Sequence, residues 1–592
     1  MVDGMQTTAE IAYFSMEVAL DARMPTYSGG LGVLAGDTLR TAADLGVPMV
    51  AVCLLHRRGY FRQTLGPDGE QHEAPEDWPV EQLLEPLPGQ VTVAVAGRDV
   101  RLRGWRYDVR GCRGHVVPVI FLDSRLEDND EAARTLTDQL YGGDARYRLS
   151  QEILLGVGGV RMLRLLGFGG IRRFHMNEGH AALLTLELLE EQHRGNGHNG
   201  VGEQEIEKVR EQCVFTTHTP VPAGHDQFPL ELAAELLGRG RAPQLRDVFA
   251  IDVYRQVLRS DQRFAPPRDA LDHDLMLNMT YVALNLSRHV NGVAHSHGEI
   301  SRLMFAEYSV DAITNGVHAA TWIAPPMAAV LDRHVPGWQA DNYSLRYALA
   351  IPLAEIAEAH AVAKRELLEH VLATTGRRLE PTRFTLGFAR RATAYKRPDL
   401  LFADLERLRA IARCHGGLQV LYAGKAHPAD AGGKALIRDV YAAARTLRDD
   451  GIDVVWLPDY DTALAAKLVS GVDVWLNTPL PPNEASGTSG MKAAMNGVPS
   501  LSTLDGWWIE GHLEGLTGWA IGAASPGDGD DAEAIRARDA ASLYDKLEHA
   551  VLPCFLDPGD AFLEVRRHAI ALNGAFFNSQ RMLQQYLQRA YA

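Results

Sequence analysis

Cysteine is scarce in this sequence of 592 residues. The five cysteines are scattered, their number is odd, and no two have the spacing of metal ligands: Cys53, Cys112, Cys213, Cys414 and Cys554. A disulfide framework is not expected in a chain of this size. We therefore expect a reducing environment, and a cytoplasmic location fits best.

Long apolar segments are also missing. No run of about 18 apolar residues occurs, so we predict no membrane-spanning helix. The first residues, MVDGMQTTAE, contain no basic patch followed by an apolar stretch, and we expect no signal peptide.

Positive charge is in deficit. There are 59 Lys and Arg residues against 75 Asp and Glu, a formal net charge of −16. A nucleic-acid partner is not expected, because binding a phosphate backbone requires clustered cations. The 46% of hydrophobic and 23% of charged residues are typical of globular proteins, and the length predicts at least two domains.

The second half of the chain alternates apolar strands with amphipathic helices. A strand is predicted at 384–389, and a helix should begin at Pro398, with apolar residues at Leu401, Leu405, Leu408 and Ile411. Further strands are expected at 418–424, 452–457 and 473–477, and further helices at 433–447, through Leu464 and Leu468, and from about Ser489. This βαβαβ succession predicts an α/β fold with a Rossmann-like domain.

The first half also reads as α/β. Residues 91–109 alternate with period two around the turn at 96–99, so we predict an inserted hairpin. Polar loops are expected at 194–202 and 525–531. The chain should pass between domains near 320–352, which predicts one domain over 1–320, a second over 321–560, and a helical segment over 561–592 that packs back on the first.

The richest motif is EASGTSGMKAAMNG, residues 484–497. Its Ser, Gly and Thr residues open a helix, where backbone N–H groups can bind an anion. Lys492 follows Gly490 and Met491, which is not the Walker A spacing. A lysine desolvated there could be a neutral amine, as Schiff-base chemistry requires. On local sequence alone, a solvent-facing lysine is the more frequent outcome.

Two further segments could bind phosphate. ARRATAYKRPD (389–399) follows a strand and places four cations close together, Arg390, Arg391, Lys396 and Arg397. YSGGLGVLAGD (27–37) is a Gly-rich loop between a strand and a helix. Taken singly, the basic segment could equally be a solvated loop, and for the Gly-rich loop a structural turn is the more frequent outcome. Three such segments in one chain favour phosphate chemistry.

Polar residues follow other strands and could line a binding site. They are Asn177, Glu178, His218 and Asn315. Each alone could be a helix cap or a hydrogen-bonded core residue. Pairs of histidines occur at 175 and 180 and at 295 and 297, but no carboxylate or cysteine completes a ligand set, so no metal is predicted.

These motifs together resemble the α-glucan phosphorylase family, whose members act on glycogen, starch and maltodextrin. EASGTSGMK is similar to the family's pyridoxal-lysine motif, and SGGLG, TTHTP, VNGVAHSHGEI, ITNGVHAATW and ARRATAYKRPD also occur in the family's order. The resemblance implies a GT-B fold, in which two Rossmann-like domains face each other across a cleft that holds pyridoxal 5′-phosphate. It implies phosphorolysis of α-1,4-glucan ends by inorganic phosphate to α-glucose 1-phosphate with retention of configuration, and it is compatible with a homodimer.

The resemblance also implies a role for individual residues. Lys492 would be the Schiff-base lysine, and Trp322 would form a wall of the cofactor pocket. The cofactor phosphate would be held by Thr488, Ser489 and Arg390, and the substrate phosphate by Arg391, Lys396 and the backbone of Gly30. The reacting glucose would contact Glu484, Ser486, Gly487, Asn315 and His218, with Asn177 and Glu178 also lining the sugar site.

There are departures from the family pattern. The best-known members have lysine at the position of Arg390 and Gly-Asn at Ser489–Gly490. The chain is also much shorter than the animal enzymes and begins almost at the first strand of the catalytic region, so control by phosphorylation or AMP is not expected.

Two other functions are compatible with this pattern. A nucleotide-sugar glycosyltransferase such as glycogen synthase shares the GT-B fold but needs no cofactor lysine. A non-catalytic glucan-binding protein would not need the lysine, arginines and glutamate that are present. A glycoside hydrolase needs two carboxylates across the scissile bond, and no such pair is identified.

Overall fold

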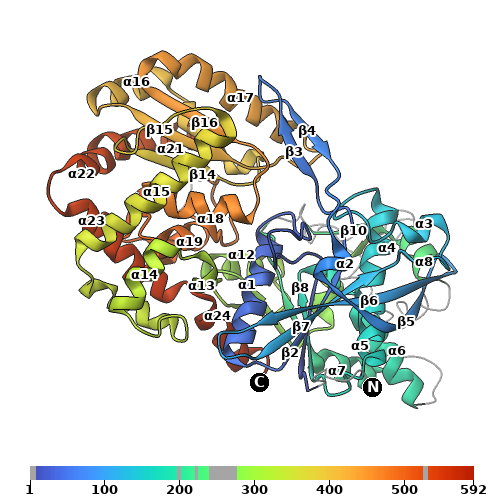
Figure 1. Ribbon diagram of the computed structural model, residues 1–592. Helices are drawn as coiled ribbons and strands as arrows, with labels where there is room; N and C mark the ends of the chain where they lie inside the picture. The colour runs from blue at the N-terminus through green and yellow to red at the C-terminus, as the bar shows by residue number, and fades with distance from the viewer. Residues whose placement is uncertain (1–7, 197–201, 221–224, 239–275, 524–530) are drawn as a thin grey trace.

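The computed structural model describes residues 8–196, 202–220, 225–238, 276–523 and 531–592. Figure 1 shows two α/β bodies, one built mainly from the first half of the chain and the other from the second. Most of the predicted loops at 194–202 and 525–531 lies outside the described residues. Within the described ranges, no helix is both long and apolar enough to cross a membrane.

The first body contains a nine-stranded sheet with the order β13-β12-β9-β8-β1-β2-β7-β6-β5. Its strands are β1 (Ile11–Ser15), β2 (Met49–Leu54), β5 (Glu85–Val95), β6 (Arg98–Arg110), β7 (Val116–Asp123), β8 (Arg173–Asn177), β9 (Cys213–Thr216), β12 (His289–Gly292) and β13 (Asp311–Ala312). The seven strands from β13 to β7 are parallel, and β6 and β5 extend the sheet in antiparallel fashion. The predicted hairpin is confirmed as β5–β6, and its turn residues Ala96 and Gly97 both have positive φ, 52° and 73°.

The second body contains a six-stranded parallel sheet with the order β16-β15-β14-β17-β18-β19. Its strands are β14 (Thr385–Ala389), β15 (Leu418–Ala423), β16 (Ile452–Leu457), β17 (Val474–Asn477), β18 (Ser500–Thr503) and β19 (Gly518–Ile521). In chain order this is 3-2-1-4-5-6, the arrangement of dinucleotide-binding folds. The α/β class and the two-sheet GT-B arrangement are therefore confirmed.

The helices of the second body occur where expected, with one correction. They include α16 (Leu405–Cys414), α17 (Ala431–Leu447), α18 (Thr462–Gly471) and α19 (Ser489–Met495). The helix predicted to begin at Pro398 begins at Leu405, after a 3-10 turn at Leu400–Phe402. The reason is a cap at Asp404, whose side chain accepts a hydrogen bond from the N–H of Arg407.

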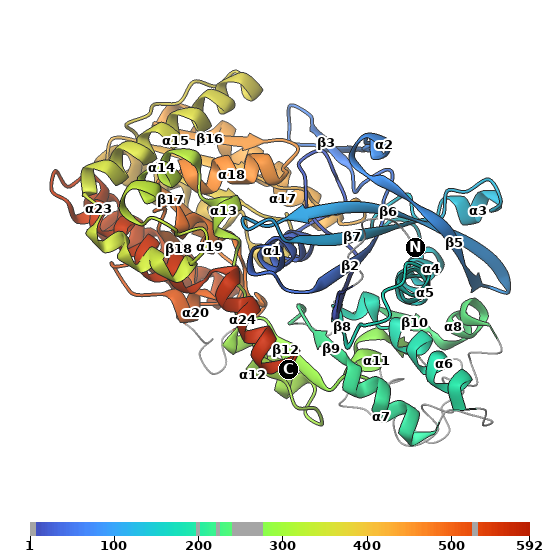
Figure 2. The ribbon, with the colours of Figure 1, turned by 60° about the horizontal axis from the view of Figure 1, so that its bottom comes forward.

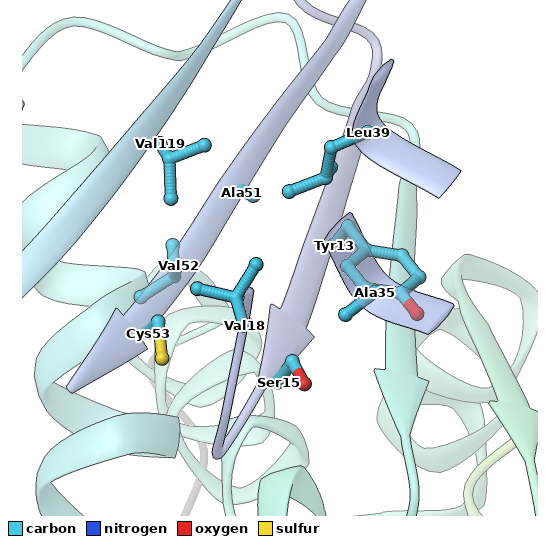
Figure 3. A pocket seen from close by; sticks show the side chains of 9 residues that line it. All are labelled: Tyr13, Ser15, Val18, Ala35, Leu39, Ala51, Val52, Cys53 and Val119. Atoms are coloured by element: carbon cyan, nitrogen blue, oxygen red, sulfur yellow. The ribbon is translucent and has the colours of Figure 1, made fainter. Parts of the chain in front are cut away.

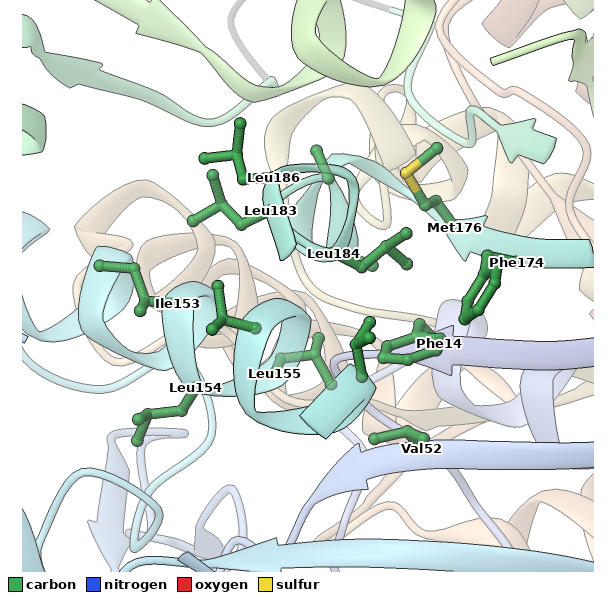
Figure 4. Packing of buried hydrophobic residues seen from close by; sticks show 14 of the residues in the cluster. Phe14, Val52, Ile153, Leu154, Leu155, Phe174, Met176, Leu183, Leu184 and Leu186 are labelled. Carbon is green, nitrogen blue, oxygen red and sulfur yellow. The ribbon is translucent and has the colours of Figure 1, made fainter. Parts of the chain in front are cut away.

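Helices cover both faces of the first sheet. On one face, the π-helical turn η1 (Leu154–Gly158), α5 (Gly159–Leu165) and α6 (Leu184–Asn196) pack on Phe14 and Phe174 (Figure 4). At Gly159 a Cβ atom would lie 2.5 Å from the Phe14 ring, so only glycine allows this close packing. On the other face lies α1 (Gly30–Leu45), whose Ala35 and Leu39 pack on strands β1, β2 and β7 (Figure 3). The side chains in Figure 3 leave no space for a water molecule, so this region is core.

The two bodies are connected through α13 (Ala319–Trp322), α14 (Pro325–His334), the 3-10 segment η5 (Asn342–Ala350) and α15 (Leu353–Thr375). The chain ends with α23 (Ala561–His568), the π-helical segment η10 (Ala569–Gly574) and α24 (Ser579–Arg589). Helix α24 packs against α1 of the first body, where the hydroxyls of Ser579 and Thr41 form a hydrogen bond (Figure 2). The domain limits at 320 and 560 stay a prediction.

An antiparallel hairpin of the first body reaches the second. We call it the β3–β4 arm, residues 62–74, with strands β3 (Arg62–Leu65) and β4 (Gln71–Ala74) (Figure 1). The side-chain amide of Gln63 donates to the carbonyl oxygen of Gly424 at 3.0 Å, and that of Gln71 donates to Ala426 at 2.9 Å. Leu65 packs against the core of the second body.

Candidate active site

The predicted site residues gather where the strand order of each sheet reverses. In the first sheet this point lies between β1 and β8, and in the second between β14 and β17. Ligands of open α/β sheets bind outside the carboxyl ends of the strands at such points. Asn177 ends β8, Arg390 follows β14 directly, and Glu484 lies on the connection after β17.

Lys492 is buried, so the solvent-facing alternative is wrong. Its side-chain amine lies 3.8 Å from the centre of the Trp322 ring, and 7% of the residue is exposed. Asn496 joins the two residues, because its amide donates to the carbonyl oxygens of Lys492 and Trp322 at 3.0 and 2.8 Å. Burial lowers the pKa of Lys492 to about 8, although Asp37 opposes this shift. A neutral amine is therefore accessible near neutral pH.

A cavity of about 190 Å³ lies between the two bodies at Trp322. Its walls include Ala19, Val33, Arg40, Trp322, Thr462 and Ala466. The walls are mostly apolar, and Trp322 contacts both this cavity and Lys492. The cavity and the Lys492 amine therefore share Trp322 as a neighbour, and a largely apolar ring bound at Trp322 would lie close to the amine.

Glu484 forms an ion pair with two of the predicted phosphate-binding cations. One oxygen of its carboxylate accepts hydrogen bonds from both Arg390 and Lys396. Burial alone would raise the pKa of Glu484, but the charges of Arg390 and Lys396 lower it to about 2. Burial, together with the charge of Arg390, lowers the pKa of Lys396 to about 7. From the sequence, Glu484 is assigned to the sugar and the two cations are assigned to phosphates. In the structure the three side chains are in contact.

The other two cations of the same segment have different surroundings. Arg391 is exposed and reaches the Gly-rich loop of the first body, with its Nη2 atom 3.4 Å from the hydroxyl oxygen of Ser28. Arg397 is buried and donates to Asp539 and to the carbonyl oxygens of Thr478 and Pro479, so it stabilises the fold. Arg391 therefore marks the place where the two bodies could share an anion.

The Gly-rich loop is held by Glu17, which sequence reasoning did not identify. Its carboxylate accepts hydrogen bonds from the N–H groups of Ser28 and Gly29 at 2.6 and 3.1 Å, and from the Tyr141 hydroxyl at 3.0 Å. A Cβ atom on Gly30 would meet nothing within 4 Å, so space does not require glycine there.

Asn177, Glu178 and His218 form one hydrogen-bonded group. The ring nitrogen Nε2 of His218 lies 2.7 Å from the side-chain oxygen of Asn177. The backbone N–H of His218 donates a hydrogen bond to the carboxylate of Glu178 at 2.7 Å. Burial lowers the pKa of His218 to about 4, so its ring is neutral at pH 7. The Asn177 amide donates to Ser15 at 3.0 Å, which turns its oxygen toward His218. His218 Nε2 therefore carries the proton, and Nδ1 is the hydrogen-bond acceptor.

Three buried polar atoms on predicted site residues have no hydrogen-bond partner within the described residues. They are the side-chain oxygen of Asn315, the hydroxyl of Ser486 and the Nη1 atom of Arg390. Buried polar atoms are nearly always paired, so atoms such as these indicate a polar ligand. Arg581 of α24 donates to the carbonyl oxygen of Asn315 at 2.9 Å and fixes that segment.

The remaining predicted residues surround the start of α19. Gly487 has a positive φ of 74°, and Thr488 is the N-cap residue of α19. The Ser489 hydroxyl accepts a hydrogen bond from the Trp475 indole at 3.1 Å. Together with the preceding groups, these residues place the predicted lysine, cations and polar side chains around the junction of the two sheets.

The family model for carbohydrate phosphorylases matches residues 164–514. The chain is 38% identical to a glycogen phosphorylase of Mycobacterium tuberculosis, with 98% of this chain and 70% of the relative covered. The chain belongs to the carbohydrate phosphorylase family. It is also 35% identical to a maltodextrin phosphorylase of Thermococcus litoralis (98% and 70% covered) and to a glycogen phosphorylase of Aquifex aeolicus (98% and 86% covered).

Asp505 is a residue of this phosphorylase that sequence reasoning missed. Its carboxylate accepts hydrogen bonds from the N–H groups of Glu484 and Gly506 at 2.8 and 2.9 Å. Burial and, to a smaller degree, the charge of Glu484 raise the pKa of Asp505 to about 7. No spacing or composition signal distinguishes Asp505 in the sequence, because its partners are set by the fold of the loop.

Asp37 was also missed, although a signal exists. The helix α1 is mostly apolar, but Asp37, Thr41 and Asp44 follow one another at helical spacing and are all buried. A buried polar stripe on an apolar helix indicates specific partners. One partner of Asp37 is Trp322, whose indole N–H lies 2.8 and 3.1 Å from the two carboxylate oxygens.

The histidines considered as metal ligands make other contacts. His175 bonds to Thr216 and Tyr591, and His297 accepts a hydrogen bond from the Val293 N–H. Among the residues that the structure describes, no group of three His, Cys, Asp or Glu side chains could hold a metal ion.

Proposed function

We propose that this phosphorylase cleaves glucose from the non-reducing ends of α-1,4-glucans with inorganic phosphate. The product is α-glucose 1-phosphate, its configuration is retained, and pyridoxal 5′-phosphate is held on Lys492. The observation that carries this proposal is the burial of the Lys492 amine against Trp322, beside a cavity between the bodies. The named glycogen and maltodextrin phosphorylases support the substrate class.

The residues present fit the cofactor. The cavity at Trp322 would hold the pyridine ring, and Lys492 would bond its aldehyde carbon. Arg390, with its unpaired Nη1 atom, and the start of α19 at Thr488 and Ser489 would hold the phosphate group. When bound, the cofactor would supply this phosphate as an acid–base group next to the substrate phosphate, rather than an electron sink.

Arg391 and Lys396 would bind the substrate phosphate, with the backbone of Gly30 on the opposite side. Two phosphates in contact repel strongly, so a site that accepts both needs nearby cations. Arg391 lies next to the loop that contains Gly30, since a Cβ atom on Gly29 would be 3.3 Å from its Nη2 atom. The anion would therefore be bound from both bodies.

The sugar would be held by uncharged and ionised acceptors. The neutral His218 ring offers Nδ1 to a hydroxyl, such as the 6-hydroxyl, because Asn177 fixes the proton on Nε2. Asn315, Ser486 and the N–H near Gly487 offer further groups. Glu484 has a low pKa and is ionised, so it would accept a hydrogen bond from a glucose hydroxyl once phosphate takes over its cations.

A hydrolase mechanism fits less well. Glu484 and Asp505 are the neighbouring carboxyl groups, but both already have partners. Glu484 is paired with two cations, and Asp505 accepts hydrogen bonds from two backbone N–H groups. A hydrolase needs two carboxyl groups free to flank one glycosidic bond. A nucleotide-sugar transferase would leave the buried amine of Lys492 without a role.

Two measurements test this function together. Borohydride reduction of protein prepared with pyridoxal phosphate, followed by peptide mapping, should place the pyridoxyl group on Lys492. Maltodextrin and phosphate should then yield glucose 1-phosphate, while Lys492→Ala should yield none. Label on a different lysine, or sugar transfer from a nucleotide sugar without phosphate, would contradict the proposal.

A further inference from the structure

Helix α1 presents a buried polar stripe to the second half of the chain. Asp37 contacts Trp322, Thr41 contacts Ser579, and Asp44 accepts a hydrogen bond from His318 at 2.8 Å. Asp37 is fully buried, and a buried carboxylate is costly unless it is paired. Its partners among the described residues are the Trp322 indole and, at 3.5 Å, the Arg40 guanidinium.

Asp37 and Arg40 are also the charged groups that act on Lys492. Asp37 favours the protonated amine and Arg40 disfavours it, and both come from α1, whereas Lys492 is on α19. Arg40 is fixed by a hydrogen bond to the carbonyl oxygen of Leu20 at 2.7 Å and lines the cavity at Trp322. Two opposite charges on one helix therefore act on the amine.

We propose that Asp37 is a positioning residue of the Lys492 pocket, which fixes the Trp322 ring against the amine and places a negative charge toward it. This inference depends on the proposed function for one point only, that the pocket binds pyridoxal 5′-phosphate. Helix α1 also begins at Gly30, seven residues before Asp37, which at 1.5 Å per residue is about 10 Å. One rigid helix thus sets the spacing between the proposed phosphate loop and the lysine pocket.

The proposal predicts opposite effects for two neighbouring charges. In cofactor-free protein, the rate at which an amine reagent such as trinitrobenzenesulfonate modifies Lys492 should rise with pH as the amine loses its proton. Asp37→Asn removes the charge that favours the proton, so the midpoint of this curve should fall by ~1 pH unit, and modification at pH 7 should be up to about tenfold faster. Arg40→Gln should move the midpoint upward.

The control variant is Asp44→Asn, which alters the same stripe at its His318 contact and should leave the midpoint of Lys492 unchanged. Circular dichroism and thermal unfolding test whether each variant is folded. If Asp37→Asn does not fold, the midpoint measured for Arg40→Gln still tests the proposal. Equal midpoints in Asp37→Asn, Arg40→Gln and wild type, or shifts in the same direction, would overturn it.

A second readout concerns Trp322 and separates this proposal from the proposed function. Trp322→Phe keeps the ring but removes the N–H that binds Asp37. Pyridoxal phosphate occupancy, measured by borohydride reduction and peptide mapping, should fall in both Trp322→Phe and Asp37→Ala, which lose this hydrogen bond, and full occupancy in both would contradict the positioning role. If the cofactor bonds another lysine, the proposed function fails, but the opposite midpoint shifts at Lys492 are still expected.

Discussion

Removal of the Glu484 side chain should destabilise the protein in a way that inorganic phosphate reverses. In Glu484→Ala, Arg390 and Lys396 lose the carboxylate that both contact. Taking one partner from a buried ion pair costs ~3–5 kcal/mol. Unfolding entropy is ~2.1 cal/mol/K per residue, or ~1.2 kcal/mol/K for 592 residues, so the melting temperature should fall by ~2–4 °C.

Phosphate should restore most of this loss, because it supplies the missing negative charge. At a concentration one hundred times its dissociation constant, a ligand adds ~2.7 kcal/mol of stability. In the variant no carboxylate competes for the cations, so phosphate should raise the melting temperature more than in wild type. Thermal unfolding with and without phosphate, at constant ionic strength, measures both effects.

The loss should also depend on pH. Without Glu484 the pKa of Lys396 falls further below its value of about 7, while the unfolded lysine stays protonated. The unfolded state of the variant therefore binds more protons near pH 6 relative to its folded state, and its stability rises more steeply with pH there than that of wild type. The deficit should be larger at pH 6 than at pH 8.

The control is Glu355→Ala, which removes an exposed carboxylate paired with Arg333 and His334. Exposed pairs contribute ~0–1 kcal/mol, so its melting temperature and its response to phosphate should match wild type. If Glu484→Ala melts like wild type, or if phosphate stabilises both proteins equally, Glu484 is not the counter-ion of these cations.

Three further outcomes are expected. Lys396→Ala should lower kcat by the equivalent of ~2.7–4 kcal/mol while pyridoxal phosphate still labels Lys492, and turnover like that of wild type would reject its role at the phosphate. Glu484→Gln keeps an acceptor oxygen, so phosphorolysis should fall without vanishing, and a glycosyl ester trapped on Glu484 in the parent enzyme with a slow fluorinated donor would contradict this role. Asp505 has a folded pKa of about 7, above its ordinary value, so its native state holds a proton that the unfolded state loses, and the contribution of this residue to stability should decrease between pH 4 and 7. Asp505→Asn removes this contribution, so its stability should rise more steeply with pH over this range than that of wild type, and an unchanged slope of stability against pH would refute the assignment.

Much of the fold could be predicted from local patterns in the sequence. The strands of the second sheet are continuous apolar runs bounded by Gly or polar residues, which is why β14 and β15 fall within a residue of their predicted limits. The start of α16 was missed because Pro398 and Asp404 are both acceptable helix starts, and only the cap at Asp404 decides between them.

The site was predictable where chemistry is concentrated in one segment. Lys492 and Arg390 lie in motifs whose composition is unusual, and the structure brings them to the junction of the sheets. Contacts between distant segments were not predictable. Asp37 and Trp322 are 285 residues apart, and Glu484 and Arg390 are 94 apart, so no local pattern shows that they pair.

The β3–β4 arm has a consequence for synthesis on the ribosome. Its partners Gly424 and Ala426 lie 361 and 355 residues further along the chain. At translation rates of ~5–20 residues per second, roughly 20–70 s pass between the synthesis of the arm and that of these two partner residues. An unpaired hairpin with an apolar face would be open to aggregation during that time. The sequence of the arm, RQTLGPDGEQHEA, contains only Leu65 and Ala74 as apolar residues and therefore stays soluble until the second sheet has formed.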